Sequence, residues 1–154
     1  MPDAAVVQDK SNPDFAARLM AVQAQYQISQ NEQPLRVVIE EYLNQHKVVK
    51  TVDGDVVGKP NSTLFKKILI GVEDRLSDVN DILNAHIKTE PKKQVEPLLK
   101  AILLCGISEL LIHTDIDKAL IINDYLNVSH SFYDQGQVSF VNGILDAVAN
   151  RLRS

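Results

Sequence analysis

The stretch from Leu98 to Asp146 constrains the fold most strongly, because apolar residues recur in it at helical spacing. Three successive sets step by three or four residues, so each set falls on one face of an α-helix. The sets are Leu99, Ile102, Leu103, Ile107, Leu110 and Leu111; Ile116, Leu120, Ile121, Tyr125, Val128 and Phe132; and Phe140, Val141, Ile144, Leu145, Val148 and Leu152. Three amphipathic helices are therefore predicted in this part of the chain.

Polar residues interrupt these sets where helical periodicity does not require them. Glu109 lies in the first set, Asn123-Asp124 in the second and Asn142-Gly143 in the third. Glycine inside a helix costs about 1 kcal/mol relative to alanine. Gly143 therefore predicts a close approach between two helices.

The N-terminal half carries helix-start signals followed by apolar faces. Asn12-Pro13-Asp14 predicts a helix from about 13 to 29, with a capping side chain, proline at the first position and an acid near the positive end of the dipole. A second helix is predicted after Pro34, ending near His46. Asn61 is expected to cap one long helix of about 25 residues, ended by Thr89-Glu90-Pro91. Its acidic side, predicted to face solvent, holds Glu73, Asp74, Asp78 and Asp81.

One segment departs from the helical pattern. Val48–Gly58 has β-branched residues on both sides of Asp53-Gly54, a strong signal for a β-hairpin. A lone two-stranded hairpin is only marginally stable in water. The segment is therefore interpreted either as a small hairpin at 48–57 or as a disordered loop.

Length and composition bound the architecture. A chain of 154 residues with 45% hydrophobic and 23% charged residues predicts one domain, 12–154, after a flexible tail, 1–11. No apolar run is long enough to span a membrane and the N-terminus does not resemble a secretion signal, so a cytoplasmic protein is expected. Cys105 is the single cysteine and lies within an apolar set, which favours a core position.

Charge and motif content point away from two functional classes. A net charge of −4 and scattered cations argue against strong nonspecific nucleic-acid binding, which needs clustered Lys and Arg. The sequence holds no phosphate-binding glycine-rich loop, and its histidines lack metal-ligand spacing. The four histidines are His46, His86, His113 and His130. We therefore expect a non-enzymatic binding protein without cofactor or metal.

Several blocks of the sequence together resemble the NusB family of transcription antitermination factors. They are Ala17-Arg18, Ala21-Val22-Gln23-Ala24, Tyr26-Gln27, Ile102-Leu103, Glu109-Leu110-Leu111, Asp115, Ile122-Asn123-Asp124 and Phe140-Val141-Asn142-Gly143-Ile144-Leu145-Asp146. The resemblance implies an all-α fold of about seven helices in two packed three-helix groups. The hairpin at 48–57 would be an addition to that fold.

The resemblance also implies a function. Such a factor pairs with a small-subunit ribosomal protein in the NusE role, binds boxA-type single-stranded RNA of ribosomal RNA leader transcripts, and acts indirectly on the RNA polymerase elongation complex. Two weak RNA surfaces would then combine into a stronger one. The alternative is a protein–protein adaptor or homodimer with little RNA affinity. The noncatalytic N-terminal domain of an RNA methyltransferase is disfavoured, because the chain stops at Ser154 without a cofactor-binding domain.

Six residues are predicted RNA contacts from the resemblance and from their chemistry. Aromatic rings stack on unpaired bases, while amides and cations reach base edges and phosphates. The residues are Arg18, Gln23, Tyr26, Phe132, Phe140 and Asn142. Core packing is the alternative for the three rings, and contact with nearby backbone is the alternative for Asn142.

Departures from the family pattern predict a weakened RNA surface on a preserved fold. Only Arg18 remains where the family has an arginine-rich segment, since 14–16 read Asp, Phe and Ala. The loop at 134–139 lacks a cation, and 115–119 lacks the usual proline and shifts its lysine by one position. Leu104 stands where the family's fifth helix usually has arginine.

Overall fold

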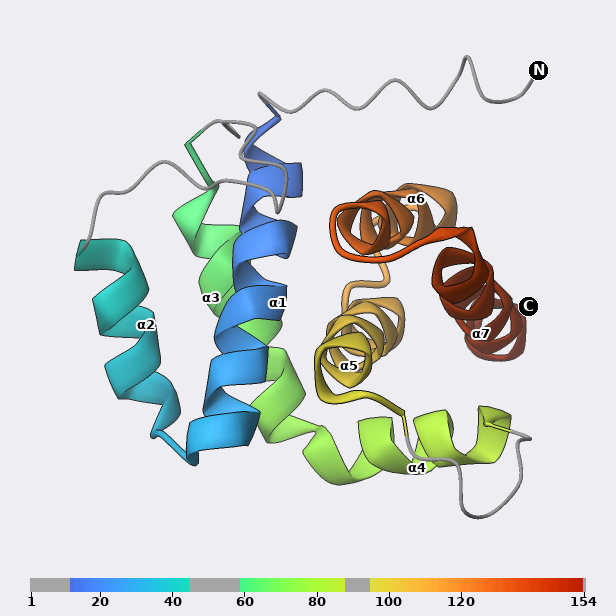
Figure 1. Ribbon diagram of the computed structural model, residues 1–154, viewed down its shortest axis with the longest axis horizontal. Helices are drawn as coiled ribbons and strands as arrows, with labels where there is room; N and C mark the ends of the chain where they lie inside the picture. The colour runs from blue at the N-terminus through green and yellow to red at the C-terminus, as the bar shows by residue number, and fades with distance from the viewer. Residues whose placement is uncertain (1–11, 45–58, 88–94, 154) are drawn as a thin grey trace.

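The computed structural model describes residues 12–44, 59–87 and 95–153, and within these ranges all regular structure is α-helical (Figure 1). The helices are α1 (Pro13–Asn31), α2 (Leu35–Asn44), α3 (Ser62–Asp74), α4 (Leu76–His86), α5 (Pro97–Ile112), α6 (Lys118–His130) and α7 (Gln135–Leu152). The all-α prediction is confirmed. The tail at 1–11 and the hairpin predicted at 48–57 lie outside the described residues.

The predicted helix starts are confirmed by their capping hydrogen bonds. Asn12 Oδ1 accepts from the backbone N–H of Asp14 at 2.8 Å, and Asn61 Oδ1 accepts from that of Leu64 at 3.2 Å. Each bond satisfies a donor that the first turn of a helix leaves without an intrahelical partner. Asn61 Nδ2 also donates to Asp14 Oδ1 at 2.9 Å, which joins the beginnings of α1 and α3.

Two expected boundaries are corrected. The single long helix predicted after Asn61 is two helices, because Arg75 leaves helical geometry at φ −116° and ψ 25°. α3 packs on α1 and α5, whereas α4 packs on α5 and α7, and the change of direction at Arg75 lets both apolar faces reach the core (Figure 1). The predicted loop at 134–139 is the first turn of α7, capped by Asp134.

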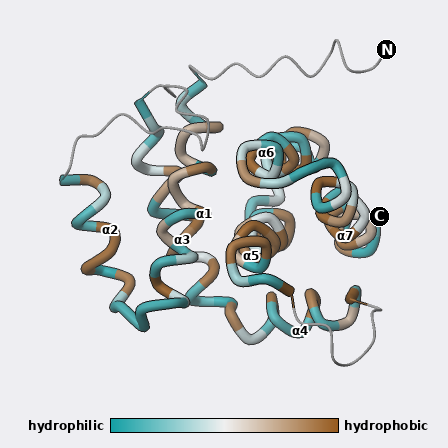
Figure 2. The backbone as a smooth tube through the Cα atoms, in the orientation of Figure 1, coloured by the Kyte–Doolittle hydropathy of each residue, from teal (hydrophilic) through white to brown (hydrophobic). Residues whose placement is uncertain are grey.

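α5 lies at the centre of the domain. It contacts α1, α3, α4, α6 and α7, and every residue from Ala101 to Leu110 is buried. α1, α2 and α3 form one group of helices and α5, α6 and α7 form the other, as predicted (Figure 1). Hydrophobic residues dominate α5 in Figure 2. Within the described ranges, no helix is both long enough and apolar enough to cross a lipid bilayer.

The close helix approach predicted at Gly143 occurs elsewhere. A Cβ added to Gly143 would meet no heavy atom within 4 Å, so this glycine faces open space. At Gly106 an added Cβ would lie 3.0 and 3.2 Å from the two Cδ atoms of Leu145. Close packing is therefore permitted by Gly106 on α5, where α7 approaches it, and by Gly71 on α3, where an added Cβ would lie 3.1 Å from both Ile112 Cδ1 and Ser108 Oγ of α5.

We expect the substitution Gly143→Ala to give a more stable protein than the substitution Gly106→Ala. Gly143→Ala should stabilise the protein by up to about 1 kcal/mol, because alanine is the better helix former and the site is open. The free energy of unfolding of Gly106→Ala should be about 1–3 kcal/mol lower than that of Gly143→Ala, because Leu145 is fully buried and must move. Urea unfolding measures both, and equal effects would contradict the assignment.

A buried ion cluster and a candidate binding groove

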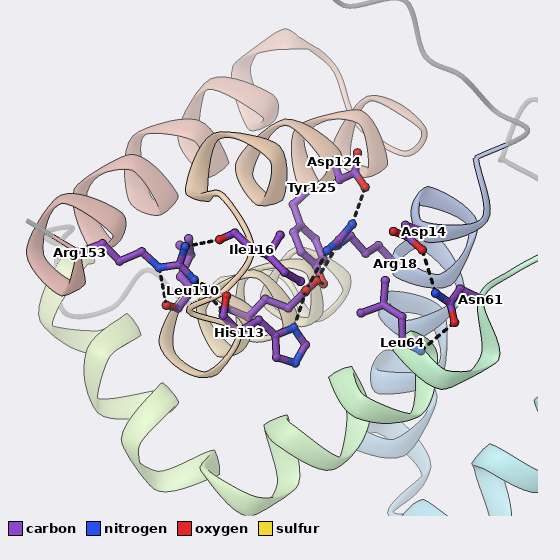
Figure 3. A network of polar contacts seen from close by, with 11 residues as sticks. Asp14, Arg18, Asn61, Leu64, Leu110, His113, Ile116, Asp124, Tyr125 and Arg153 are labelled. Atoms are coloured by element: carbon purple, nitrogen blue, oxygen red, sulfur yellow. Dashed lines mark hydrogen bonds and ion pairs between the residues drawn. The ribbon is translucent and has the colours of Figure 1, made fainter.

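Arg18 connects α1 to α5 and α6 through a buried ion cluster (Figure 3). Its side chain is 1% exposed. Nε and Nη2 donate to the two carboxylate oxygens of Glu109 at 2.7 and 2.9 Å, and Nη1 donates to Asp124 Oδ2 at 2.9 Å. The planar guanidinium thus makes a bidentate pair with one carboxylate and a single bond with another, a geometry that lysine cannot reproduce.

Glu109 accepts hydrogen bonds from three side chains. Besides Arg18, the Tyr125 hydroxyl donates to Oε2 at 2.6 Å, and His113 Nδ1 lies 2.8 Å from Oε1. Burial by itself raises the pKa of Glu109. The hydrogen bonds from His113 and Arg18, the charge of Arg18 and the Tyr125 hydrogen bond outweigh it and lower that pKa to about 2. The carboxylate therefore stays ionised inside the core.

Asp124 behaves differently from Glu109, although both contact Arg18. Burial raises the pKa of Asp124; the charge and hydrogen bond of Arg18 oppose that rise, and the nearby charges of Glu109 and Asp14 add to it. The net direction is upward, because Asp124 accepts one hydrogen bond where Glu109 accepts four. Glu109 is therefore the main anion of the cluster.

A second arginine, Arg153, caps the C-terminal end of α5. Arg153 Nε donates to the carbonyl of Leu110 at 3.0 Å, Nη1 to that of Ile116 at 2.5 Å, and Nη2 to that of His113 at 2.7 Å (Figure 3). Carbonyls at a helix C-terminus lack intrahelical donors and carry partial negative charge. Arg153, which follows α7 in the chain, therefore holds the turn between α5 and α6.

These placements change the interpretation of Arg18. Sequence reasoning predicted a phosphate contact, but the guanidinium is buried and paired with two carboxylates, so Arg18 is a structural residue here. The signal for this role was present in the sequence. A buried ion is stable only with an opposite charge, and Glu109 interrupts an apolar helix while Arg18 interrupts another. The capping role of Arg153 was not predicted.

Three of the predicted site residues line one groove. The groove has a volume of about 710 Å³ and brings together α1, α2, the start of α5 and the segment after α6. Its lining residues are Gln23, Tyr26, Gln27, Gln30, Asn31, Tyr42, Glu96, Leu98 and Phe132. Gln23, Tyr26 and Phe132 are thus neighbours around one cavity, although Phe132 lies more than a hundred positions after Tyr26.

The described lining of the groove is rich in amides and rings and has one charge. Among these residues four carry side-chain amides, three carry aromatic rings, and Glu96 is the only ionisable acid or base besides the tyrosines. The Tyr42 hydroxyl donates to Gln27 Oε1 at 3.2 Å, and Gln27 Nε2 donates to Gln33 Oε1 at 2.7 Å. Tyr26 is 37% exposed and offers a ring to a ligand. No cation belongs to this described lining, so hydrogen bonds and stacking are the chemistry that it offers.

The other two predicted contacts lie on α7, outside the groove lining. Phe140 is half-buried and packs against the hydrophobic core, and Asn142 is exposed. Their contact with RNA stays a prediction. Among the described residues, no three His, Cys, Asp or Glu side chains are grouped so that they could hold a metal ion.

Fold and groove define a small all-α domain of two helical groups, with a polar, ring-bearing groove where the groups meet. Comparison with known proteins assigns the family. The NusB family model matches residues 16–150, and the chain belongs to the NusB family.

Individual relatives agree with that assignment. The transcription antitermination protein NusB of Novosphingobium aromaticivorans is 32% identical over 139 residues, which cover 90% of this chain and 93% of the relative. Its namesake in Gluconobacter oxydans is 33% identical over 138 residues, covering 88% and 85%. The solved structure of T. maritima NusB has the same fold, with a TM-score of 0.76 at 19% identity, covering 94% of this chain and 95% of that one.

Neutralising Glu109 should destabilise the fold strongly. In Glu109→Gln the buried Arg18 loses its bidentate anion and keeps only Asp124, and breaking a buried ion pair costs about 3–5 kcal/mol. Glu73→Gln is the matched control, because Glu73 is exposed on α3 and its loss should change stability by about 0.5 kcal/mol or less. Urea unfolding of both variants makes the comparison. Similar small losses would show that the cluster contributes little.

The same cluster predicts a pH dependence with a definite sign. Because the pKa of Glu109 is lower in the folded protein than its ordinary value of 4.5, its contribution is fully present above that value and lost as the pH falls toward about 2. The stability advantage of the wild type over Glu109→Gln should shrink by about 3 kcal/mol across this window. Thermal unfolding at several pH values measures it, and a constant difference would contradict the shift.

Asp124→Asn should behave in the opposite sense. A carboxyl whose pKa is raised on folding contributes stability below its ordinary pKa of 3.8 and loses that contribution as the pH rises. The wild type should therefore lose stability relative to Asp124→Asn as the pH rises from 3.8 toward neutrality. The same unfolding series supplies the measurement, and a wild-type advantage that grows with pH would show that Arg18 depresses both carboxyls.

Proposed function

We propose that this protein is a transcription antitermination factor that assembles with a small-subunit ribosomal protein in the NusE role on boxA-type single-stranded RNA. Membership of the NusB family and the names of its relatives support the antitermination role. The observation that carries the RNA part is the groove, where Gln23, Tyr26 and Phe132 meet.

The groove suits unpaired bases better than a charged backbone. Rings stack on bases with about 1–3 kcal/mol each, irrespective of sequence, and amides present both a donor and an acceptor to base edges. Phosphates, by contrast, require cations, and the lining residues that the structure describes include none. Since Arg18 is buried, the RNA affinity of the free protein rests on stacking and hydrogen bonds.

A weak RNA surface is sufficient if a partner supplies a second one. Binding of the ribosomal protein would place its own RNA contacts beside the groove, and linked surfaces gain affinity from effective concentration without new contacts. The polymerase elongation complex would then be reached through the assembled complex. Function in this scheme depends on assembly, with each pairwise contact remaining modest.

The first test is an RNA titration at several salt concentrations, with and without the ribosomal partner. Each neutralised phosphate on a single strand contributes about −0.7 to the slope of log affinity against log salt. With Arg18 buried, the free protein should show a slope shallower than about −2 and weak binding. The partner should tighten binding by about tenfold or more. Tight binding by the free protein with a steep slope would reveal a basic surface elsewhere.

Tyr26 gives the matched variants for that titration. Tyr26→Ala removes the stacking ring and should weaken RNA binding by about 1–3 kcal/mol, whereas Tyr26→Phe keeps the ring and should bind like the wild type. Both substitutions should leave stability nearly unchanged, because Tyr26 is 37% exposed. Equal RNA affinity of the two variants would remove Tyr26 from the binding site.

One observation favours a second function, that of a protein–protein adaptor or homodimer. A groove whose described lining has one acid and no cation can also receive a polar protein segment. Calorimetry with the ribosomal protein in the absence of RNA tests partner binding, and sedimentation of the free chain tests self-association. Partner binding or dimerisation without any RNA binding, even in the complex, would favour the adaptor.

A further inference from the structure

Among the residues that the structure describes, Glu96 is the one charged side chain lining the groove, and hydrogen bonds hold one oxygen of its carboxylate in place. Oε2 accepts the backbone N–H of Leu99 at 3.0 Å and also accepts the Tyr133 hydroxyl. Among the residues that the structure describes, none donates a hydrogen bond to Oε1. A side chain fixed in this way presents an acceptor to the groove at little further cost in conformational entropy.

A carboxylate in an RNA-binding groove limits which chemical groups of the RNA can lie beside it. It accepts hydrogen bonds and donates none, and it repels phosphate groups. The part of the strand beside Glu96 must therefore carry hydrogen-bond donors, which are the ribose 2′-hydroxyls and the N–H groups of base edges; only the base edges differ from one nucleotide to another. Unpaired bases expose their Watson–Crick edges to a protein, so this edge is what Glu96 can distinguish.

Only one of the four bases offers two adjacent donors on that edge. Guanine presents N1–H next to its N2 amino group, whereas adenine and cytosine present one amino group beside a ring acceptor that a carboxylate repels. Uracil presents one N–H between two carbonyls. Guanine O6 needs a donor, and the lining amides of Gln23, Gln30 and Asn31 carry such groups, whereas Gln27 Nε2 already donates to Gln33 and Glu41.

We propose that the groove takes an unpaired guanine and that Glu96 determines this specificity. The inference rests on the proposed function, namely that the groove binds single-stranded RNA. The guanine ring stacks against the aromatic lining, its N–H donors face Glu96, and its O6 faces an amide. Tyr133 is a positioning residue, since its hydroxyl fixes the carboxylate from outside the groove lining.

The test uses the full chain and labelled RNA heptamers that contain uridine except at the central position. Fluorescence anisotropy at low salt compares guanosine, adenosine, cytidine, uridine and inosine at that position. Guanosine should bind about tenfold more tightly than adenosine, cytidine or uridine, which is the usual discrimination of a paired base contact. Inosine keeps N1–H and O6 but lacks the amino group, so it should lose most of that advantage. This arm requires no change in the protein.

Protein variants then assign the preference to Glu96. Glu96→Gln keeps an oxygen that can cap α5 but adds a donor, so the guanosine preference should fall to about twofold or less while uridine binding is unchanged or tighter. Glu73→Gln removes the same charge from an exposed position on α3 outside the groove and should keep the full preference. Tyr133→Phe releases the carboxylate and should reduce the preference partially.

The possible outcomes distinguish a failure of the guanine inference from a failure of the proposed RNA-binding function. Equal binding of all five heptamers, weakened by Tyr26→Ala, would overturn the guanine inference and leave RNA binding in the groove intact. Guanosine preference that survives Glu96→Gln would overturn the role of Glu96. No binding of any heptamer at millimolar protein would overturn both the inference and the RNA part of the proposed function.

Discussion

The ion pair between Arg18 and Glu109 is the interaction on which the rest of the structure depends. Both side chains are almost fully buried, and an unpaired charge in a protein interior costs several kcal/mol. Each ion is tolerated because the other is present at hydrogen-bond distance. The pair therefore constrains how α1 packs against α5, because displacing either helix would leave a charge without its partner.

The geometry of the groove follows from this packing of α1 against α5. Arg18 lies on α1 about two turns before Tyr26, and Asp124 and Tyr125 lie on α6, which ends shortly before Phe132. The cluster thus holds α1, which carries Tyr26, against α6, which leads into the segment that carries Phe132. Arg153 adds a restraint at the other end of α5 by capping its carbonyls and the turn into α6. The groove walls belong to different helical groups, yet both are fixed to α5.

The use of charge inside the protein explains the character of its surface groove. The arginine that matches the family's basic segment is buried in the core, and the described lining of the groove consists mainly of amides and rings, with one acid. A lining of this kind suits discrimination by hydrogen-bond pattern and shape, because its described residues lack the long-range attraction that clustered cations provide. Under the function proposed above, affinity would come from assembly with a partner and selectivity from the groove.

The sequence alone determined the features that depend on neighbours a few positions apart. Asn12, Pro13 and Asn61 predicted helix starts, and apolar spacing predicted the buried faces, because capping and helical periodicity act over three or four residues. Resemblance to the NusB family predicted the grouping of helices and pointed to Tyr26 and Phe132.

Tertiary structure decided the features that join distant segments. Arg18 and Glu109 are separated by 91 positions and Arg18 and Asp124 by 106, so local patterns could mark Glu109 as unusual but could not supply its partner. The same limit explains why Gly143 was expected at a close contact that Gly106 makes, and why one long helix was expected where Arg75 divides two. For both features the apolar spacing predicted helix correctly. The site of the close contact and the break at Arg75 depended on which helices pack against each other, and only the folded chain specifies that packing.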